Sequence, residues 1–174
     1  ECGIDAHLAK QNPQQASYAI ATQQKIFEQH IQVANKVGKP LIVHHRQSHH
    51  FIAQSFKRVT PRYGGVIHAF SGSIQDANAY IKLGFKLGCG GTITYDRAKK
   101  TRQVFATTEL KNIVLETDAP DMPIAGFQGQ RNEPGRILDV AKCLAEIRGE
   151  SLASIAQQTS MNAQKLFFNH VSVG

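Results

Sequence analysis

Short apolar runs that end in polar residues recur along the chain. Three of them lead into His44, His68 and Asp118. An apolar run of this length, bounded by turn residues, is typical of a buried strand. With a short apolar-centred segment at the start and one more run, the pattern predicts about five strands, over residues 1–5, 41–43, 64–68, 85–88 and 112–117.

Between these runs, apolar residues recur at intervals of three and four, which predicts amphipathic helices. Gly38 is placed to end the first long helix, and Ser73 is placed to cap a later one. A loop over 121–133 contains two glycines and a proline, and loops of this length are often functional. The expected helices cover 17–37, 48–59, 73–84, 97–105, 134–147, 151–158 and 162–168.

Strands that alternate with helices predict a parallel sheet in an α/β fold. The 174 residues suit one domain over 1–174, whereas a closed (β/α)8 barrel needs roughly 250 residues. The chain is therefore either a smaller open sheet or the latter part of a TIM-like barrel. We favour a barrel whose N-terminal strands are missing, because Glu1 has the chemistry of a strand end and no strand precedes it.

Composition narrows the class of protein. Hydrophobic residues make up 41% of the chain, enough for a core, yet no run approaches the ~18 apolar residues of a membrane helix. The start of the chain lacks a secretory signal pattern. Three cysteines without Cys-x-x-Cys spacing argue against a disulfide framework and predict a reducing, cytoplasmic location.

The formal net charge of +7 fits a polyanionic partner such as DNA. Because lysine and arginine are scattered along the chain, a solvated basic surface is an equally good interpretation. The pattern predicts neither a membrane partner nor a stable protein partner.

Four side chains of metal-binding type are expected at the strand ends: Glu1, His44, His68 and Asp118. In a barrel of parallel strands that end carries the chemistry. Mixed carboxylate and imidazole sets suit Zn, Mn, Fe or Mg. One such residue alone is more often a cap or a loop residue, but four of them favour a metal site.

Arg46 follows His44 by two positions and so lies on the same side if the strand continues. Its guanidinium could hold a phosphate or form a salt bridge. His45 then points to the opposite face, and His49 and His50 are expected at the surface of the next helix.

The glycine-rich stretch 88–91 could present N–H groups to an anion, although a tight turn is the simpler use. Lys99, Lys100 and Arg102 could track a phosphate backbone or form an exposed helix face. Residues 70–73 lack the Gly-x-Ser-x-Gly pattern of a serine hydrolase, and the sequence contains no P-loop or dinucleotide fingerprint.

Several of these motifs together resemble the TatD family of metal-dependent deoxyribonucleases. Gln23 and Phe27 also fit the family's Gln-x-x-x-Phe helix, and Asn162 and Phe167 fit its last helix. The motifs that carry the resemblance are Glu1-Cys2-Gly3-Ile4-Asp5, His44-His45-Arg46, the segment 65–73, Gly91-Thr92-Ile93-Thr94, Leu115-Glu116-Thr117-Asp118-Ala119-Pro120 and Arg131-Asn132-Glu133-Pro134.

The resemblance implies an amidohydrolase-like (β/α)8 barrel with divalent metal ions, here two ions of Mg, Mn or Zn. It places a metal-bridging carboxylate at Glu1 and further metal ligands at His44, His68 and Asp118. The family's His-x-His pair on its first strand is absent, so the resemblance implies that the chain is the C-terminal two-thirds of a longer protein.

The implied reaction is hydrolysis of DNA phosphodiester bonds by metal-activated water. Asp118 would orient or deprotonate that water, Arg46 would hold the phosphate, and Glu116 would support the metal ligands. The alternatives are a small-molecule amide or ester hydrolase on the same site and a non-catalytic nucleic-acid-binding fragment.

Overall fold

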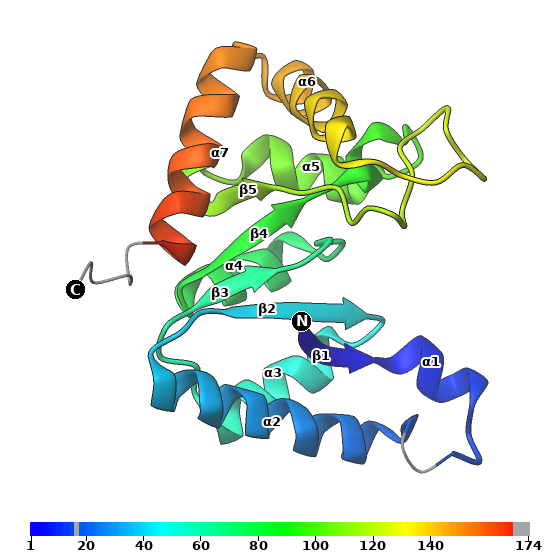
Figure 1. Ribbon diagram of the computed structural model, residues 1–174, viewed down its shortest axis with the longest axis vertical. Helices are drawn as coiled ribbons and strands as arrows, with labels where there is room; N and C mark the ends of the chain where they lie inside the picture. Colours follow the sequence, from blue (N-terminus) through cyan, green and yellow to red (C-terminus); the bar gives the residue numbers. More distant parts are fainter. Residues whose placement is uncertain (16–17, 169–174) are drawn as a thin grey trace.

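The computed structural model describes residues 1–15 and 18–168. Five parallel strands form one sheet, and their order in the sheet is their order in the chain (Figure 1). This confirms the parallel α/β sheet expected from the alternation of strands and helices. The strands are β1 (Cys2–Asp5), β2 (Leu41–Arg46), β3 (Gly65–Ile67), β4 (Phe85–Cys89) and β5 (Ile113–Leu115).

The sequential strand order distinguishes this sheet from a doubly wound one, in which the order reverses at a switch point. Each strand pairs with the next one along the chain, as strands do around a (β/α) barrel. β1 and β5 are the two edges of the sheet in the described part of the chain. The sheet is therefore arranged like a sector of a barrel, and the missing strands stay a prediction.

Helices connect the strands and pack mainly against one face of the sheet (Figure 1). Short 3-10 turns precede β5 and α6 and follow β4. The α-helices are α1 (Ala6–Gln11), α2 (Ile20–Val37), α3 (His49–Arg58), α4 (Ile74–Lys82), α5 (Lys99–Thr107), α6 (Ile137–Arg148) and α7 (Leu152–Phe167). The 3-10 turns are η2 (Gly91–Thr94), η3 (Leu110–Asn112) and η4 (Pro134–Arg136).

The helix ends follow the sequence signals closely. Gly38 ends α2 in the left-handed conformation, with a φ of 67° that glycine adopts without steric cost. Ser73 and Asp76 form a capping box at the start of α4. The expected start of the first long helix at Ser17 lies outside the described residues.

The two closing helices expected over 151–158 and 162–168 are one continuous helix, α7. Neither glycine nor proline interrupts the segment between the two expected helices. The Thr159 hydroxyl donates to the carbonyl oxygen of Ile155 one turn back, so the helix accommodates it.

Residues 89–94, which overlap the glycine-rich stretch, do not form an irregular loop. Cys89 is the last residue of β4, and residues 91–94 form the 3-10 turn η2. The Thr94 hydroxyl donates to the carbonyl oxygen of Gly91 and accepts from the N–H of Ala125, so this turn is tied to the 121–133 loop.

The two faces of the sheet differ in packing. The face toward α2–α6 carries the main core, which includes Phe27, Ile67 and Leu144. On the other face Val66 and Val114 form a small cluster with Leu166, near the end of α7, while Ile42 on the same face is 42% exposed. No helix among the described residues has both the length and the apolar character that a membrane crossing requires.

Candidate functional site

Four of the residues singled out from the sequence converge at one place. His68 Nε2 lies 3.2 Å from Asp118 Oδ1 and 3.7 Å from Glu1 Oε2. His44 Nδ1 lies 3.5 Å from Glu1 Oε1. The gathering follows from topology, because His44 is in the second half of β2 while His68 and Asp118 follow the ends of β3 and β5.

Glu1 reaches this cluster differently from the expectation. It was expected to end a strand, but it directly precedes β1. Its carboxylate still bridges the two imidazoles of His44 and His68. Asp5, which the sequence did not single out, lies on the other side of His44, with its Oδ2 3.5 Å from Nε2.

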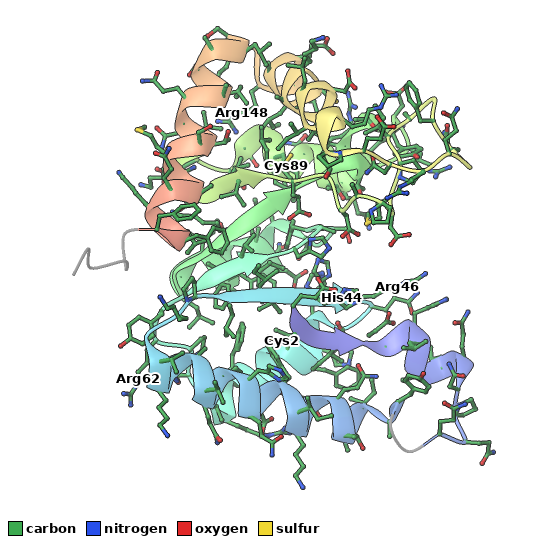
Figure 2. All side chains as sticks on the ribbon, viewed as in Figure 1. Cys2, His44, Arg46, Arg62, Cys89 and Arg148 are labelled. Atoms are coloured by element: carbon green, nitrogen blue, oxygen red, sulfur yellow. The ribbon has the colours of Figure 1, made fainter. Side chains whose placement is uncertain are left out.

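The alternation of side chains along β2 sets His44 and Arg46 on one face and His45 on the other. Figure 2 shows His44 and Arg46 near the carboxyl end of β2. Within residues 1–15 and 18–168 no carboxylate pairs with the Arg46 guanidinium. This cation is exposed and available to an anion.

His49 is a correction to the expected surface placement. It is half-buried, its Nδ1 is hydrogen-bonded to the Tyr80 hydroxyl at 2.9 Å, and its ring contacts the buried ring of His45. His50, in contrast, is exposed as expected. Burial lowers the pKa of His45 to about 3, so this imidazole is neutral.

Glu116 contacts the His68 ring at Nδ1, the nitrogen that does not face Asp118. Its Oε1 accepts a hydrogen bond from the N–H of Ala69 at 2.6 Å and lies 3.0 Å from His68 Nδ1. The hydrogen bond to Glu116 raises the pKa of His68 to about 9, against the opposing effect of burial. A carboxylate on the second ring nitrogen fixes the orientation of the imidazole.

The glycine-rich stretch makes room for this carboxylate. A Cβ on Gly88 would come within 2.2 Å of Glu116 Oε2, and Gly90 lies against the same side chain. The glycines therefore serve close packing around Glu116, and a side chain at Gly88 would displace it.

Asp118 sits on strained backbone, with a φ of 58° that residues other than glycine rarely adopt. Ala69, beside His68, has a φ of 45°. Strain of this kind clusters where side chains are held for function. Burial raises the pKa of Asp118, the nearby His68 lowers it, and the neighbouring carboxylates add to the rise.

The donor set has the chemistry of a divalent metal site. Two ligands of one ion at 2.0–2.1 Å stand roughly 3 to 3.4 Å apart, close to the 3.2 Å between His68 and Asp118. Across the described part of the chain, no group of three His, Cys, Asp or Glu side chains stands ready to hold an ion. The residue types therefore suit a divalent metal ion, and the distance between His68 and Asp118 suits two ligands of one ion. The described residues do not form a complete coordination shell.

A pocket of about 430 Å³, called the site pocket below, opens beside this cluster. His68, Asp118, Arg46 and Ser71 are in its lining. A hollow of about 510 Å³ on the open face of the sheet also reaches Glu1 and Asp118. The cluster is thus accessible from two sides.

Asn132 is a structural residue of the site to which the sequence assigned no role. It is buried, and its amide Nδ2 donates to the carbonyl oxygens of Thr117, Asp121 and Met122. These bonds fasten the 121–133 loop on both sides of Asp118. The spacing of residues gives no signal for such a contact, and only its place in an Arg-Asn-Glu-Pro motif marked it.

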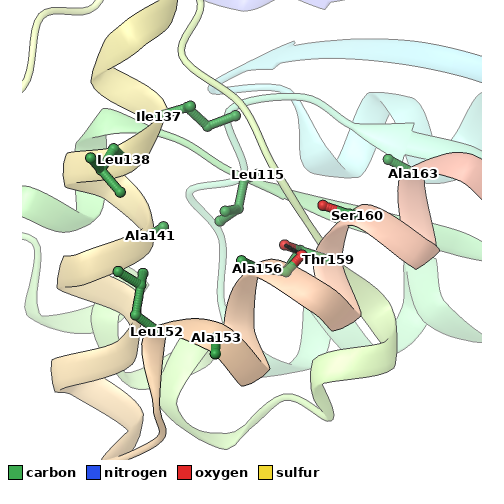
Figure 3. A pocket seen from close by; sticks show the side chains of 10 residues that line it. All are labelled: Leu115, Ile137, Leu138, Ala141, Leu152, Ala153, Ala156, Thr159, Ser160 and Ala163. Atoms are coloured by element: carbon green, nitrogen blue, oxygen red, sulfur yellow. Dashed lines mark hydrogen bonds between the residues drawn. The ribbon is translucent and has the colours of Figure 1, made fainter.

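A further pocket of about 550 Å³ lies between α6 and α7 (Figure 3). Leu138 and Leu152 line it together with small residues, and its polar groups are the hydroxyls of Thr159 and Ser160. It is apart from the strand-end cluster and contains no titratable side chain among the described residues.

Comparison with known proteins gives the cluster a context. A family model described as TatD related DNase matches residues 1–168. YjjV of Escherichia coli strain K12, an uncharacterized metal-dependent hydrolase, is 45% identical over 167 residues, which make up 96% of this chain and 62% of that protein. An uncharacterized metal-dependent hydrolase of Haemophilus influenzae is 44% identical over 147 residues, 84% of this chain and 56% of that protein.

The chain thus spans 62% and 56% of the length of these two relatives. The family match begins at residue 1, so it does not confirm the expectation that the chain is the C-terminal two-thirds of the family's domain.

Solved structures agree with the fold. The crystal structure of YjjV, a TatD homolog from Escherichia coli K12, has a TM-score of 0.86 at 41% identity, covering 96% of this chain and 62% of that one. An uncharacterized amidohydrolase from Saccharomyces cerevisiae has a TM-score of 0.78 at 19% identity, covering 96% and 64%. At that identity the second likeness concerns the fold alone.

Proposed function

Because the chain belongs to the family described as TatD related DNase, we propose that it is a metal-dependent hydrolase that cleaves phosphodiester bonds of DNA. The observation that carries the proposal is the meeting of Glu1, His44, His68 and Asp118 beside the exposed Arg46. Carboxylates and imidazoles next to an exposed guanidinium suit a cation and a phosphate in adjoining positions.

Glu1, His44, His68 and Asp118 are the residues that would hold two divalent ions, with Mg, Mn and Zn as candidates. Such ions polarise a phosphoryl oxygen and lower the pKa of water. Glu116 keeps the His68 ring in place through its Nδ1 and leaves Nε2 facing Asp118 and Glu1.

The chain's own groups supply positioning and proton transfer. Arg46 holds the scissile phosphate through its guanidinium, whose planar fork matches two phosphate oxygens. The Asp118 carboxylate accepts the proton of the attacking water. The positive backbone φ at Asp118 turns this side chain toward His68, where their atoms are 3.2 Å apart.

A small-molecule amide or ester hydrolase is the competing enzyme. The same donor set serves either substrate, since one fold hosts many chemistries. The net charge of +7 and the exposed Arg46 favour the phosphodiester. A non-catalytic nucleic-acid-binding protein is the third candidate.

The test offers metal-loaded protein a single-stranded DNA and a panel of amide and ester substrates. We expect cleavage of DNA that a chelator abolishes and that added Mg, Mn or Zn restores. Turnover of the amides or carboxylic esters alone would replace the proposal with the competing enzyme. DNA binding that survives chelation without any turnover would favour the binding protein.

A further inference from the structure

Exposed cations gather at the end of the molecule opposite the site pocket. The strands all run in one direction, so the segments that lead into them lie at one end of the sheet, where α2 and α7 also finish (Figure 1). Figure 2 shows Arg62 at this end and Arg46, from the lining of the site pocket, near the other end of β2. We call it the basic end, and its exposed cations are Lys36, Lys39, Arg62, Lys82, Lys111 and Lys165.

Backbone contacts hold the first three of these cations in one region. Lys36 is in the last turn of α2, and Lys39 follows that helix before β2 begins. The turn that carries Arg62 is bonded to the same helix, because the Arg62 N–H donates to Asn35 Oδ1 at 2.8 Å. Asn35 Nδ2 in turn donates to the carbonyl oxygen of Thr60 at 2.9 Å. The backbone at these three cations is therefore fixed by the fold.

Another group of cations lies around Lys86 in β4. Lys86 points to the open face of the sheet, because its neighbours Phe85 and Leu87 are in the main core. Its Nζ donates to the carbonyl oxygen of Lys111 at 2.8 Å. Burial lowers the pKa of Lys86, and the nearby charges of Lys111 and Lys165 lower it further. Three like charges thus repel one another here, and a bound anion would relieve that repulsion.

The carboxylates of the chain offset little of this charge. Within the part of the chain that the structure describes, Glu109 is the carboxylate that pairs with a cation of the basic end, and its Oε2 lies 2.6 Å from Lys111 Nζ. Other carboxylates, among them Glu1, Glu116 and Asp118, gather at the candidate site instead. The basic end therefore has a strong excess of positive charge.

Stabilisation of the helix ends accounts for only part of this pattern. Cations in a last turn complement the negative end of a helix dipole, and Lys36, Lys82 and Lys165 have that position. Arg62, however, lies outside the helices, and Lys86 is within β4. The remaining charge favours a partner that carries many negative charges.

We infer that the basic end binds the phosphate backbone of double-stranded nucleic acid. From the start of β2 to the start of β5 it spans three strand spacings, about 14 Å. A duplex carries one negative charge for every ~1.7 Å of its axis, so several phosphates can meet these cations at once. Such contacts position a duplex without reading its sequence.

This binding surface is distinct from the site of the proposed hydrolysis. β2 has six residues, so the basic end and the site pocket are roughly 20 Å apart. A duplex on the basic end therefore leaves the site pocket free, and the binding does not depend on cleavage. In a hydrolase that acts on DNA, it would keep the substrate near the protein between cleavage events.

An anionic lipid surface is the competing partner with dense negative charge. Val37 and Phe168, at the ends of α2 and α7, are exposed apolar side chains. A helix that binds a lipid surface presents a continuous apolar face beside its cations. The cations of the basic end come instead from the ends of several separate elements. Nucleic acid is therefore the better match, and the test includes the lipid.

A fluorescence-anisotropy titration in EDTA measures binding without turnover. Its probe is a labelled DNA duplex of about 20 base pairs, roughly two helical turns. The variant is Lys39→Ala/Lys165→Ala, which removes two exposed cations at opposite sides of the basic end. We expect about tenfold weaker binding, and a slope of log K against log salt that is smaller by about two, one for each lost phosphate contact.

Two controls locate the effect. Lys25→Ala/Lys142→Ala removes the same charge from exposed positions within α2 and α6, away from the ends of these helices, and should bind the duplex like the parent protein. Arg46→Ala removes the cation of the site pocket and should also leave duplex binding unchanged. Because all five residues are exposed, urea denaturation should show similar stability for these variants.

Several results would overturn the inference. Equal duplex binding by the parent and Lys39→Ala/Lys165→Ala is one, and an equal loss in Lys25→Ala/Lys142→Ala is another, because it would mean an effect of net charge alone. Loss of duplex binding in Arg46→Ala alone would place the duplex at the site pocket. Cosedimentation of the parent with phosphatidylserine vesicles, without binding of the duplex, would replace nucleic acid with lipid.

Cleavage of bis(p-nitrophenyl) phosphate by the metal-loaded proteins tests the hydrolase separately. This small diester does not reach the basic end, so Lys39→Ala/Lys165→Ala should cleave it at the rate of the parent. A parent protein that cleaves neither this diester nor DNA would contradict the proposed function, and the titration in EDTA would still decide the inference about the basic end.

Discussion

A single substitution at Asp118 tests whether its negative charge, and not its shape, is needed for turnover. Asp118→Asn keeps the size of the side chain and removes the basic oxygen that would accept the proton of water. We expect turnover of DNA to fall about a hundredfold or more, the scale of general base assistance, with a smaller loss of DNA binding. Single-turnover cleavage at saturating metal, together with a binding titration, measures both.

The matched control is Asp121→Asn, which neutralises an exposed carboxylate three residues further along the same loop. It should leave turnover within a few-fold of the parent. If Asp118→Asn also cleaves within a few-fold, Asp118 is a scaffold residue and the base must be sought at Glu1 or Glu116.

The positions of single site residues were predictable where the alternation of side chains along a strand, or the end of a strand, indicates them. The two-residue period of β2 correctly placed His44 with Arg46 and opposite His45. The rule that strand ends of a parallel sheet lie at one edge correctly predicted that His44, His68 and Asp118 lie close together. Asp5 ends β1 beside β2, so the strand-end rule applied to it as well and was not used. Asn132 was not predictable, because its contacts depend on the path of a loop that no local pattern specifies.

Among the elements, the 121–133 loop depends on a single side chain. The Asn132 Nδ2 group donates to the carbonyl oxygens of Asp121 and Met122 in the loop and to that of Thr117, just before Asp118. Asn132→Asp replaces these donors with an acceptor, and a buried group without a partner costs about 1–3 kcal/mol. We expect a lower free energy of unfolding in urea and, in the metal-loaded protein, weaker turnover through a displaced Asp118.

Asn132→Ser helps to separate an effect on the position of Asp118 from an effect on the stability of the whole fold, since serine keeps one donor in a smaller side chain. It should retain more turnover than Asn132→Asp. Full activity in Asn132→Asp would mean that the loop holds its course without these three bonds.

The start of α4 is a second element that one residue controls. The Ser73 hydroxyl accepts from the N–H of Asp76, and the Asp76 carboxylate accepts from the N–H of Ser73. Ser73→Ala should lower the free energy of unfolding by about 1 kcal/mol, as urea denaturation would measure. Ser160→Ala, at an exposed position within α7, should show no loss.

The pH of this measurement matters. Burial of Asp76 raises its pKa, but the two hydrogen bonds with Ser73 outweigh this effect and leave the pKa below its usual value. The stabilisation is therefore present above the unfolded-state pKa and is lost as the pH falls through the folded-state pKa. At pH 7 the full effect should appear, and an unchanged stability there would contradict a working capping box.

Element boundaries were predictable where glycine, proline or a cap marks them, as at Gly38 and Ser73. They were missed where tertiary packing decides. In α7 the buried amide of Asn162 donates to the carbonyl oxygens of Leu110 and Ile113, and these bonds hold the helix against η3 and β5. No local signal distinguishes this arrangement from two shorter helices.

At the scale of the whole molecule, the alternation of strands and helices was enough to predict a parallel sheet with its chemistry at one edge. It did not predict how the second face of the sheet is covered. The last turns of α7 place Leu166 against Val66 and Val114, a small cluster compared with the main core. Helix periodicity specifies which residues are buried but not which face of a sheet receives them.

The open face and the two edge strands lead to a prediction about association. Among the described residues β1 and β5 each pair with a strand on one side only, and Ile42 is 42% exposed on the open face. Exposed edges and apolar side chains favour contact with another copy. We expect the 174-residue chain to associate in a concentration-dependent way, and Ile42→Lys to reduce that association, because a buried ammonium between two sheets is costly.

Light scattering coupled to size-exclusion chromatography measures the mass at several concentrations. Val33→Lys is the matched control, since Val33 is 59% exposed on α2 but faces away from the sheet. Association should persist in Val33→Lys and fall in Ile42→Lys. A parent chain that is monomeric and unfolds cooperatively at every concentration would show that the end of α7 covers the open face well enough by itself, and would count against a barrel sector that is incomplete.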